Sequence, residues 1–314
     1  MSQTPLVSIV TPSYNQAAFL EETIQSVLAQ NYPNLEYWVM DGGSTDGSVE
    51  IIRKYASHLS GWISEKDNGQ ADAINKGFKR ATGEIVAWLN SDDLYRPGAV
   101  QSAVSIFQEN PEVGLVYSDV DSVDAEGDIF NRMQYAQWGI RDLMTFNILG
   151  QPGVFFRRSV LESSGYLDLS YQYLLDHHLW LRMALNAPLK YSPGEVWAAA
   201  RIHAGAKNVA DAAGFGQEAY RLVEWMRDDE RFAPYWDGYR SQVWAGAHRL
   251  NAFYLLNGGK PGAALKAYWR GFWRYPLTIL KDWRRIGFAL LSPFKLDKMR
   301  DRYLENKKKR LFDE

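Results

Sequence analysis

The stretch Trp88-Leu89-Asn90-Ser91-Asp92-Asp93 decides the fold class of this chain. An apolar run over 85–89 ends abruptly in an amide, a hydroxyl and two carboxylates. Five apolar residues bounded by polar ones predict a buried strand, so both carboxylates lie at its carboxyl end, the edge where open α/β sheets bind ligands. Adjacent carboxylates repel each other unless a cation neutralises them, and hard oxygen ligands suit Mg²⁺ or Mn²⁺.

Predicted strands and helices alternate on both sides of this stretch. The sequence predicts strands over 7–10, 35–40, 62–63, 85–89 and 114–117, and helices over 19–30, 48–55 and 69–81, with a further helix opened by Pro97. This alternation indicates an α/β fold with a mostly parallel sheet sandwiched by helices. From residue 213 onward the pattern is helical. We therefore place a domain boundary near residue 210, with a sheet domain over 1–210 and a helical C-terminal region over 211–314.

The composition and charge of the chain indicate where the protein is located and what kind of partner it meets. The chain has 314 residues and no cysteine, which excludes disulfides and thiolate metal sites. It opens without a signal-peptide pattern, and no apolar run approaches the ~18 residues that span a bilayer, so we expect a cytoplasmic protein. Residues 259–314 carry 15 Lys and Arg against 6 Asp and Glu, whereas the remaining residues have a balance of −11. The basic end is expected to face something anionic.

Polar segments follow the first four predicted strands, over 11–15, 41–47, 67–72 and 90–93. Because the carboxyl ends of parallel strands meet at one edge, we expect these segments to converge. A Gly-rich strand end is by itself often only a turn. Crowded carboxylates, however, are costly unless they meet a cation or a donor. The pattern therefore favours a ligand site over plain turn chemistry.

Three motifs in combination resemble glycosyltransferase family 2, whose members have the GT-A fold. They are VSIVTPSYN at 7–15, DGGSTD at 41–46 and NSDD at 90–93. Shorter matches are DNGQ at 67–70, NKG at 75–77 and QPGVFFR at 151–157, so that the resemblance covers about residues 5–205. It implies that residues 1–210 form a Rossmann-like GT-A catalytic domain, and that residues 211–314 are an α-helical extension.

The resemblance also implies a role for each matching position. Asp41 matches an aspartate that accepts a hydrogen bond from the uracil ring, and a carboxylate is a suitable partner for the ring N–H of uracil. The loop that lines the base and the ribose is matched by Thr11, Pro12, Tyr14 and Asn15. The other implied substrate-binding residues are Asp67, Gln70, Asn90, Ser91, Asp93 and Gln151.

The metal site implied by the resemblance centres on Asp92. Residues 90–92 match the Asp-x-Asp motif, whose last carboxylate binds the divalent cation, here Mg²⁺ or Mn²⁺. Asn90 departs from that motif and leaves Asp92 as the main charged ligand. His203, in an Arg-x-His element, is a further implied metal ligand or diphosphate contact. Two plainer interpretations stay open, namely that Asp93 only stabilises a following helical turn and that His203 is structural.

The segment LDHHLWLR at 175–182 resembles the family's acidic motif before an apolar helix. The matching position makes Asp176 the implied general base, which takes the proton of an acceptor hydroxyl. The alternative is that Asp176 is the N-cap of the helix. The adjacent His177 and His178 are expected to be an acceptor-side contact and a packed ring, because no further zinc ligands have suitable spacing.

These features predict an inverting, non-processive glycosyltransferase. The expected donor is a nucleotide sugar, with UDP as the nucleotide, and the expected acceptor is a hydroxyl of a glycan or lipid-linked molecule in cell-surface polysaccharide synthesis. The family's Gln-x-x-Arg-Trp element, which marks processive synthases, is missing. A dehydrogenase is disfavoured because no Gly-x-Gly-x-x-Gly turn follows the first strand. A non-catalytic nucleotide-sugar-binding or scaffold protein with a helical interaction tail is the alternative.

The C-terminal region predicts one tetratricopeptide-like helical hairpin over 251–276, followed by a basic amphipathic tail over 276–310. Tryptophan together with Lys and Arg on an amphipathic helix is typical of an interfacial membrane helix. We therefore expect peripheral attachment to the anionic inner membrane face. The alternative is that Trp269 and Trp273 pack on protein. Nucleic-acid binding is not expected, because the basic stretch has no recognised motif.

Overall fold

The computed structural model describes residues 4–203 and 212–291, which form two compact units. The first unit comprises the chain up to Trp138 together with Leu149–Arg201. The second comprises Gly139–Ile148 and the chain from Ile202 onward. The boundary expected near residue 210 lies outside the described residues. The assignment of residues 139–148 to the second unit was not predicted.

The first unit contains all the described strands. Its strands are β1 (Val7–Ser13), β2 (Leu35–Asp41), β3 (Gly61–Ser64), β4 (Ile85–Trp88), β5 (Leu94–Tyr95), β6 (Leu115–Val123), β7 (Ile129–Met133), β8 (Val154–Arg157) and β9 (Leu189–Arg201). Its helices are α1 (Leu20–Leu28), α2 (Ser48–Tyr55), α3 (Gln70–Phe78), α4 (Ala99–Glu109), α6 (Arg158–Ser164) and α7 (Leu175–Asn186), with short 3-10 turns η1 (Ala56–His58) and η2 (Gln151–Gly153).

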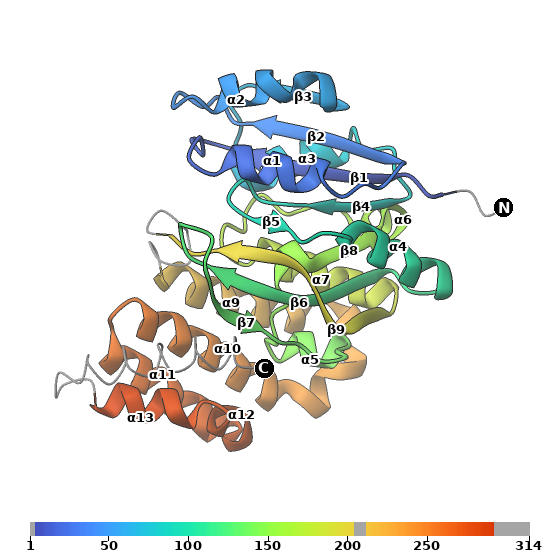
Figure 1. The fold of residues 1–314 in the computed structure, drawn as a ribbon. Helices are drawn as coiled ribbons and strands as arrows, with labels where there is room; N and C mark the ends of the chain where they lie inside the picture. The colour runs from blue at the N-terminus through green and yellow to red at the C-terminus, as the bar shows by residue number, and fades with distance from the viewer. Residues whose placement is uncertain (1–3, 204–211, 292–314) are drawn as a thin grey trace. The chain divides into compact units, whose positions relative to one another are not determined.

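The described strands form one sheet in the order β3-β2-β1-β4-β8-β6-β9-β5, and β7 pairs with β6 (Figure 1). The strands β3, β2, β1 and β4 are parallel to one another. β8 then runs antiparallel to both β4 and β6. The predicted α/β class with helices on the sheet is therefore confirmed, and the second half of the sheet is mixed rather than parallel.

The register of the parallel strands brings three polar residues into one row. Ser13 at the end of β1 pairs with Asp41 on β2, and Asp41 pairs with Ser64 on β3. β4 lies on the other side of β1, with Trp88 beside Val10. The expected convergence of the first four strand ends at one edge is confirmed by this register.

Helices cover both faces of the sheet. On one face, Trp88 of β4 stacks on Trp180 of α7 at 5.2 Å between ring centroids, and Phe78 of α3 meets Trp88 edge-on at 5.9 Å. On the other face, α1, α2 and α4 pack on the strands through a separate buried cluster that includes Ile24 and Val104. Burial of the apolar side chains on both faces of the sheet is the main favourable contribution to the stability of the fold.

Two local expectations were wrong. Pro97 does not open a helix, because α4 begins at Ala99 after Gly98, which adopts a left-handed backbone at φ 81°. Asp176 is not the N-cap of α7, because the N-cap is Leu174 and Asp176 lies inside the first turn. A proline followed by glycine makes a turn before the helix rather than its first residue.

The second unit is helical in the residues that the structure describes. Its helices are α5 (Ile140–Met144), α9 (Ala212–Asp228), α10 (Ala233–Asn257), α11 (Pro261–Arg274), α12 (Pro276–Leu280) and α13 (Trp283–Leu291), with a 3-10 turn η3 (Glu230–Phe232). A helical hairpin of α10 and α11 is present where the sequence predicts one. No helix among residues 4–203 and 212–291 has the length and apolar content needed to cross a bilayer. The predicted basic tail beyond residue 291 lies outside the described residues.

Small residues let the helices of the second unit approach closely. A Cβ on Gly246 of α10 would lie 2.2 Å from the carbonyl oxygen of Thr145, and a Cβ on Gly271 would lie 2.5 Å from Ile279. Contacts this short leave no room for a side chain. Gly246 therefore explains how residues 139–148 dock against α10 and join the second unit.

Candidate active site

Asp41 organises the loop that follows β2. Its carboxylate accepts hydrogen bonds from the backbone N–H groups of Gly43 and Ser44 at 3.0 and 2.9 Å, and from the hydroxyls of Ser44 and Ser64 at 2.5 and 2.7 Å. Asp41 is buried, and its Oδ2 accepts three of these donors while its Oδ1 accepts the Ser44 hydroxyl. Oδ1 therefore keeps acceptor capacity for a ligand N–H such as that of uracil.

The loop after β1 is tied to the Asp41 loop through Asn15. The backbone N–H of Asn15 donates to Ser44 Oγ at 2.8 Å, and Asn15 Oδ1 accepts from the backbone N–H of Thr45 at 2.9 Å. Asn15 holds a left-handed backbone at φ 52°, which asparagine tolerates better than most residues. Two strand-end loops are thus fixed against each other before any ligand binds.

The other residues proposed for the base and ribose differ in exposure. Thr11 is fully buried, and its hydroxyl lies 3.0 Å from the Tyr37 hydroxyl inside the core. Pro12 is also buried, whereas the Tyr14 side chain is 62% exposed. Tyr14 can therefore meet a ligand directly, while Thr11 and Pro12 shape the strand end beneath it.

Asp67 lies over the loop that follows β2. A Cβ on Gly42 would lie 2.6 Å from Asp67 Oδ2, so the Asp67 carboxylate lies directly against the backbone of Gly42. Asp67 Oδ1 accepts the backbone N–H of Gly69 at 2.8 Å, just before α3 begins. The structure therefore brings the third strand end against the second.

Three side-chain amides form a connected network at the end of β4. Asn90 Oδ1 accepts from Gln70 Nε2 at 2.8 Å, and Asn90 Nδ2 donates to Gln151 Oε1 at 3.1 Å. Gln151 Nε2 donates in turn to the carbonyl of Trp88 at 2.7 Å. Asn90 Nδ2 also donates to Asp93 Oδ2 at 3.2 Å. An amide supplies both the donor and the acceptor that this position needs, which an aspartate could not do.

Asp93 is buried and bound to Arg201. Asp93 Oδ1 accepts the backbone N–H of Arg201 at 2.9 Å, and the Asp93 carbonyl accepts the Thr23 hydroxyl at 2.8 Å. Burial raises the pKa of Asp93 well above its ordinary value, and the charge of Asp92 raises this pKa further. The residues that follow form strand β5, so the idea that Asp93 only stabilises a helical turn is wrong.

Asp92 is the half-buried carboxylate of the pair, and Ser91 beside it is buried. Among the described residues, no group of three or more His, Asp and Glu side chains is arranged to hold a metal ion. Mg²⁺-type ions are commonly held by one or two carboxylates together with substrate phosphates, not by a full protein cage. The half-buried carboxylate of Asp92 fits an ion of that kind, shared with a diphosphate.

His203 lies two residues beyond the end of β9 and is half-buried. The chain from Ile202 onward belongs to the second unit. The role of His203 as a metal ligand or diphosphate contact therefore stays a prediction from the sequence.

Asp176 lies in the first turn of α7, next to the buried His177 and His178. Its Oδ1 accepts the backbone N–H of His177 at 2.7 Å, and a carboxylate at a helix N-terminus is stabilised in its ionised form. The charge of Asp176 reaches Tyr135, whose phenol pKa is raised by burial first and by Asp119 and Asp176 after it. Asp176 is half-buried, and its charge acts on the phenol of Tyr135.

Tyr135 and Arg201 were not singled out by the sequence. A Cβ on Gly150 would lie 2.4 Å from the Tyr135 hydroxyl, so Tyr135 touches the chain just before Gln151. The guanidinium of Arg201 donates through Nε to the carbonyl of Asp92 at 3.1 Å. The Arg-x-His element at 201–203 was the available signal for Arg201, whereas no motif indicated Tyr135.

Ser13 is a further residue that sequence reasoning missed. It ends β1 beside Asp41, and its buried hydroxyl has no hydrogen-bond partner in the part of the chain that the structure describes. A buried hydroxyl without a partner is costly, and a ligand group at this edge would satisfy it.

A sheet with polar strand ends, an acidic pair and a carboxylate at a helix start defines an α/β protein with a candidate ligand site at one edge of its sheet. Residues 8–162 match the sequence model of Glycosyl transferase family 2. This segment, about half of the chain, therefore belongs to glycosyltransferase family 2.

Curated relatives agree with this assignment. An uncharacterized glycosyltransferase of Rickettsia typhi is 30% identical over 215 residues, which cover 64% of this chain and 65% of the relative. The putative teichuronic acid biosynthesis glycosyltransferase TuaG of Bacillus subtilis is 37% identical over 33% of this chain and 43% of its own length. The chain thus spans less than two thirds of each of these relatives.

Solved structures share the fold. The structure of S. aureus TarS in complex with UDP-GlcNAc has a TM-score of 0.64 at 17% identity, covering 96% of this chain and 89% of that chain. A mannosyltransferase from Pyrobaculum calidifontis in complex with GDP-Man and Mn²⁺ has a TM-score of 0.59 at 23% identity, covering 100% of this chain and 89% of that one. These likenesses support the GT-A fold of the chain.

Proposed function

We propose that this protein is an inverting, non-processive glycosyltransferase. It transfers a sugar from a nucleotide sugar, with UDP as the favoured nucleotide, to a hydroxyl of a glycan or lipid-linked acceptor in cell-surface polysaccharide synthesis. The observation that carries the proposal is the row of polar strand ends, in which Ser13, Asp41 and Ser64 lie in register beside the acidic end of β4. Relatives named for teichuronic acid synthesis and a fold shared with a UDP-GlcNAc complex support it.

In this proposal the nucleoside binds at the loops after β1, β2 and β3. Tyr14 covers the base, and the base N–H donates to Asp41 Oδ1 beside the Ser44 hydroxyl. Asn15 and Asp67 hold the loops in place. Because these contacts form without ligand, binding loses little conformational entropy.

A divalent cation fits the end of β4. Asp92 would hold the ion, with the donor diphosphate supplying further oxygens and His203 as a second candidate ligand. When bound, Mg²⁺ or Mn²⁺ neutralises charge on the departing nucleoside diphosphate. The protein's own part is to fix Asp92, whose carbonyl is held by Arg201, and to keep the amides of Asn90, Gln70 and Gln151 in one network.

Asp176 is the proposed general base. A base must lie within hydrogen-bond reach of the acceptor hydroxyl and must be ionised. The helix N-terminus of α7 favours the ionised carboxylate, which takes the proton as the acceptor oxygen attacks the anomeric carbon. Attack from the face opposite the leaving group inverts the configuration.

A thermal-shift screen of nucleotide sugars with and without divalent cation tests the donor site. A bound ligand raises the midpoint by mass action, and we expect UDP-sugars with Mg²⁺ or Mn²⁺ to give the largest shifts. Equal shifts after chelator treatment would contradict the metal-dependent site. Hydrolysis or transfer of the donor that binds best separates an enzyme from the alternative, a non-catalytic nucleotide-sugar-binding or scaffold protein. The proposal also places the protein in the cytoplasm, peripheral to the inner membrane face, where a lipid-linked acceptor would be reached.

A further inference from the structure

Large exposed hydrophobic side chains gather near the end of the described chain. Of the nine such side chains in the described residues, seven lie between residues 269 and 291. They are Trp269, Trp273, Leu277, Leu280, Trp283, Leu290 and Leu291. Single exposed apolar residues are normal, but a concentration of them marks an interaction site.

These side chains are not part of the local core. The inward sides of α10, α11 and α12 meet through Ala252, Ala264, Ala267, Tyr268 and Ile279. Trp269 and Trp273, by contrast, are 62% and 71% exposed, with their rings 5.5 Å apart on adjacent turns of α11. These two tryptophans therefore do not pack in the core of the second unit, and their packing on the first unit or on another subunit is not tested by the structure. Helices α11 to α13 have a buried side and an exposed apolar side.

The exposed charges of the same helices are all positive. Between residues 260 and 291 the sequence has seven Lys and Arg, all exposed, and a single acidic residue, Asp282. Asp282 is buried, and its Oδ1 accepts from Arg285 at 2.9 Å. Asp282 therefore offsets Arg285, and no other acidic residue occurs in this stretch.

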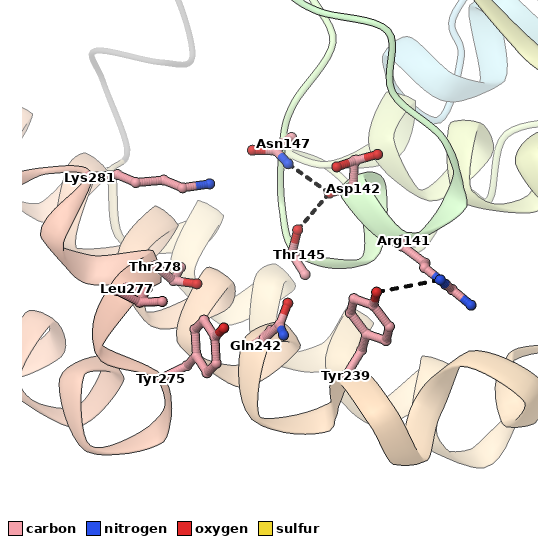
Figure 2. Close-up of a pocket in the computed structure, with 10 residues that line it drawn as sticks. All are labelled: Arg141, Asp142, Thr145, Asn147, Tyr239, Gln242, Tyr275, Leu277, Thr278 and Lys281. Atoms are coloured by element: carbon pink, nitrogen blue, oxygen red, sulfur yellow. Dashed lines mark hydrogen bonds between the residues drawn. The ribbon is translucent and has the colours of Figure 1, made fainter.

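A polar cavity of about 410 Å³ lies at α12 (Figure 2). Lys281 and Leu277 of α12 line it together with Arg141 and Asp142 of α5. Asp142 Oδ2 already accepts the backbone N–H of Gly139 at 3.0 Å. Arg141 and Lys281 outnumber the single carboxylate of Asp142, so the cavity suits an anionic group with several oxygens. Leu277 lines this cavity and is also one of the seven exposed hydrophobic residues.

We propose that α11, α12 and α13 form a docking face for anionic membrane lipid, with the cavity at α12 receiving a lipid phosphate headgroup. Tryptophan and leucine enter the interfacial region, and the surrounding Lys and Arg meet the anionic lipid surface. The docking face is defined by the seven exposed hydrophobic residues between 269 and 291 and the seven cations between 260 and 291.

A membrane matches this face better than a second copy of the chain does. A two-fold contact between two copies would bring the cations of each face together without acidic partners, which costs free energy. An anionic bilayer satisfies both the charge and the apolar side chains. The proposal does not depend on the transferase activity, since docking needs no donor.

The test is sedimentation of the full-length protein with vesicles of pure phosphatidylcholine and with vesicles that contain phosphatidylglycerol. We expect binding to the anionic vesicles only, and weakening by salt, because surface charges are screened. Replacing Trp269, Trp273 and Trp283 by serine should lower the partition coefficient at least tenfold, whereas Leu169→Ser, at an exposed position of the first unit, should not.

A charge variant tests the cavity and the basic surface. The double variant Lys281→Gln and Arg284→Gln should lower anionic binding about 25-fold, at about fivefold for each cation. The matched control, Lys79→Gln with Arg80→Gln on or beside α3, removes the same charge elsewhere and should bind normally.

Absence of vesicle binding by the intact protein would overturn the proposal, as would equal binding by the tryptophan variant. It would also be overturned if size-exclusion chromatography showed a dimer that only the tryptophan variant dissociates. A variant with Lys307, Lys308, Lys309 and Arg310 replaced by glutamine gives a further test. Loss of vesicle binding by this variant, with normal binding by the tryptophan variant and the Lys281/Arg284 variant, would refute docking through α11 to α13.

Discussion

The backbone N–H of Arg201 donates to Asp93 Oδ1 at 2.9 Å, although 108 residues separate the two. The side chain of Arg201 also donates to the carbonyl of Asp92 at 3.1 Å and to the carbonyl of Ala125 at 2.6 Å. Only 3% of Arg201 is exposed. One buried arginine at the end of β9 thus fixes the acidic turn at the end of β4, and its charge lies beside two carboxylates.

The variant Arg201→Gln tests this coupling. Loss of buried charge-assisted hydrogen bonds costs about 2 kcal/mol, and a turn that is less well positioned should reduce kcat/KM for the donor about tenfold or more. Steady-state kinetics at several Mg²⁺ or Mn²⁺ concentrations and thermal unfolding measure the two effects. The control Glu22→Gln removes only the exposed partner of Arg201 and should change stability by less than about 1 kcal/mol. An unchanged kcat/KM for the donor in Arg201→Gln would contradict the prediction.

Much of the site could be predicted because it is local to strand ends. The loops after β1, β2, β3 and β4 were found from apolar runs that end in polar residues, and parallel neighbours must share an edge. The contact of Arg201 with Asp93 could not be found in this way. It depends on β9 running back beside β5, an antiparallel pairing between segments about 100 residues apart. Periodicity within one segment carries no information about such pairings.

Some matched motifs turn out to serve packing. Asn75 donates through Nδ2 to the carbonyl of Leu167 at 2.8 Å and accepts its N–H at 3.0 Å. A Cβ on Gly77 would lie 2.3 Å from Val10 Cγ1. The NKG match at 75–77 therefore reflects close packing of α3 on β1 and an anchor for a distant loop. A motif gives residue types and spacing, but not whether each side chain faces a ligand or the core.

The variant Asn90→Asp restores the family's Asp-x-Asp pattern, and we expect it to destabilise this protein. An ionised aspartate cannot donate to Asp93 Oδ2 or Gln151 Oε1, which Asn90 Nδ2 now does. It would also add a charge beside the buried Asp93. The cost should be about 1–3 kcal/mol in the free energy of unfolding. Chemical denaturation measures it, with Asn31→Asp at an exposed position as the control. Equal or greater stability of Asn90→Asp would show that the amide network matters little.

The variant Asp176→Asn should lose transfer and keep donor binding. General base catalysis contributes about 10²–10⁴-fold, so kcat should fall by that factor while the donor dissociation constant changes less than about twofold. Single-turnover transfer and calorimetric titration of the donor separate the two quantities. Glu162→Gln, which changes an exposed carboxylate on α6, should leave both unchanged. Undiminished turnover by Asp176→Asn would refute its role as the base.

His248 makes the second unit sensitive to acid. It is a buried histidine of α10, and its Nδ1 lies 2.8 Å from the Tyr220 hydroxyl of α9. Burial first, and then the charges of Arg274 and Arg270 on α11, lower the pKa of His248 from 6.5 to about 4. The folded protein therefore keeps this ring neutral at pH values where the unfolded chain binds a proton.

The direction of the pH effect follows from this difference. Below the unfolded pKa the unfolded state binds more protons, so stability is fully present above about pH 6.5 and is lost as the pH falls toward 4. The full difference between the unfolded and folded pKa of His248 corresponds to an upper limit of about 3 kcal/mol in the free energy of unfolding. Solvent screening lowers the loss expected between about pH 7.5 and about pH 5 to about 1 kcal/mol. In His248→Gln this share of the pH dependence should disappear. Urea unfolding at the two pH values measures it, with the exposed His58→Gln as the control. If His248→Gln and the parent protein lost equal stability on acidification, the neutral buried ring would not be the cause.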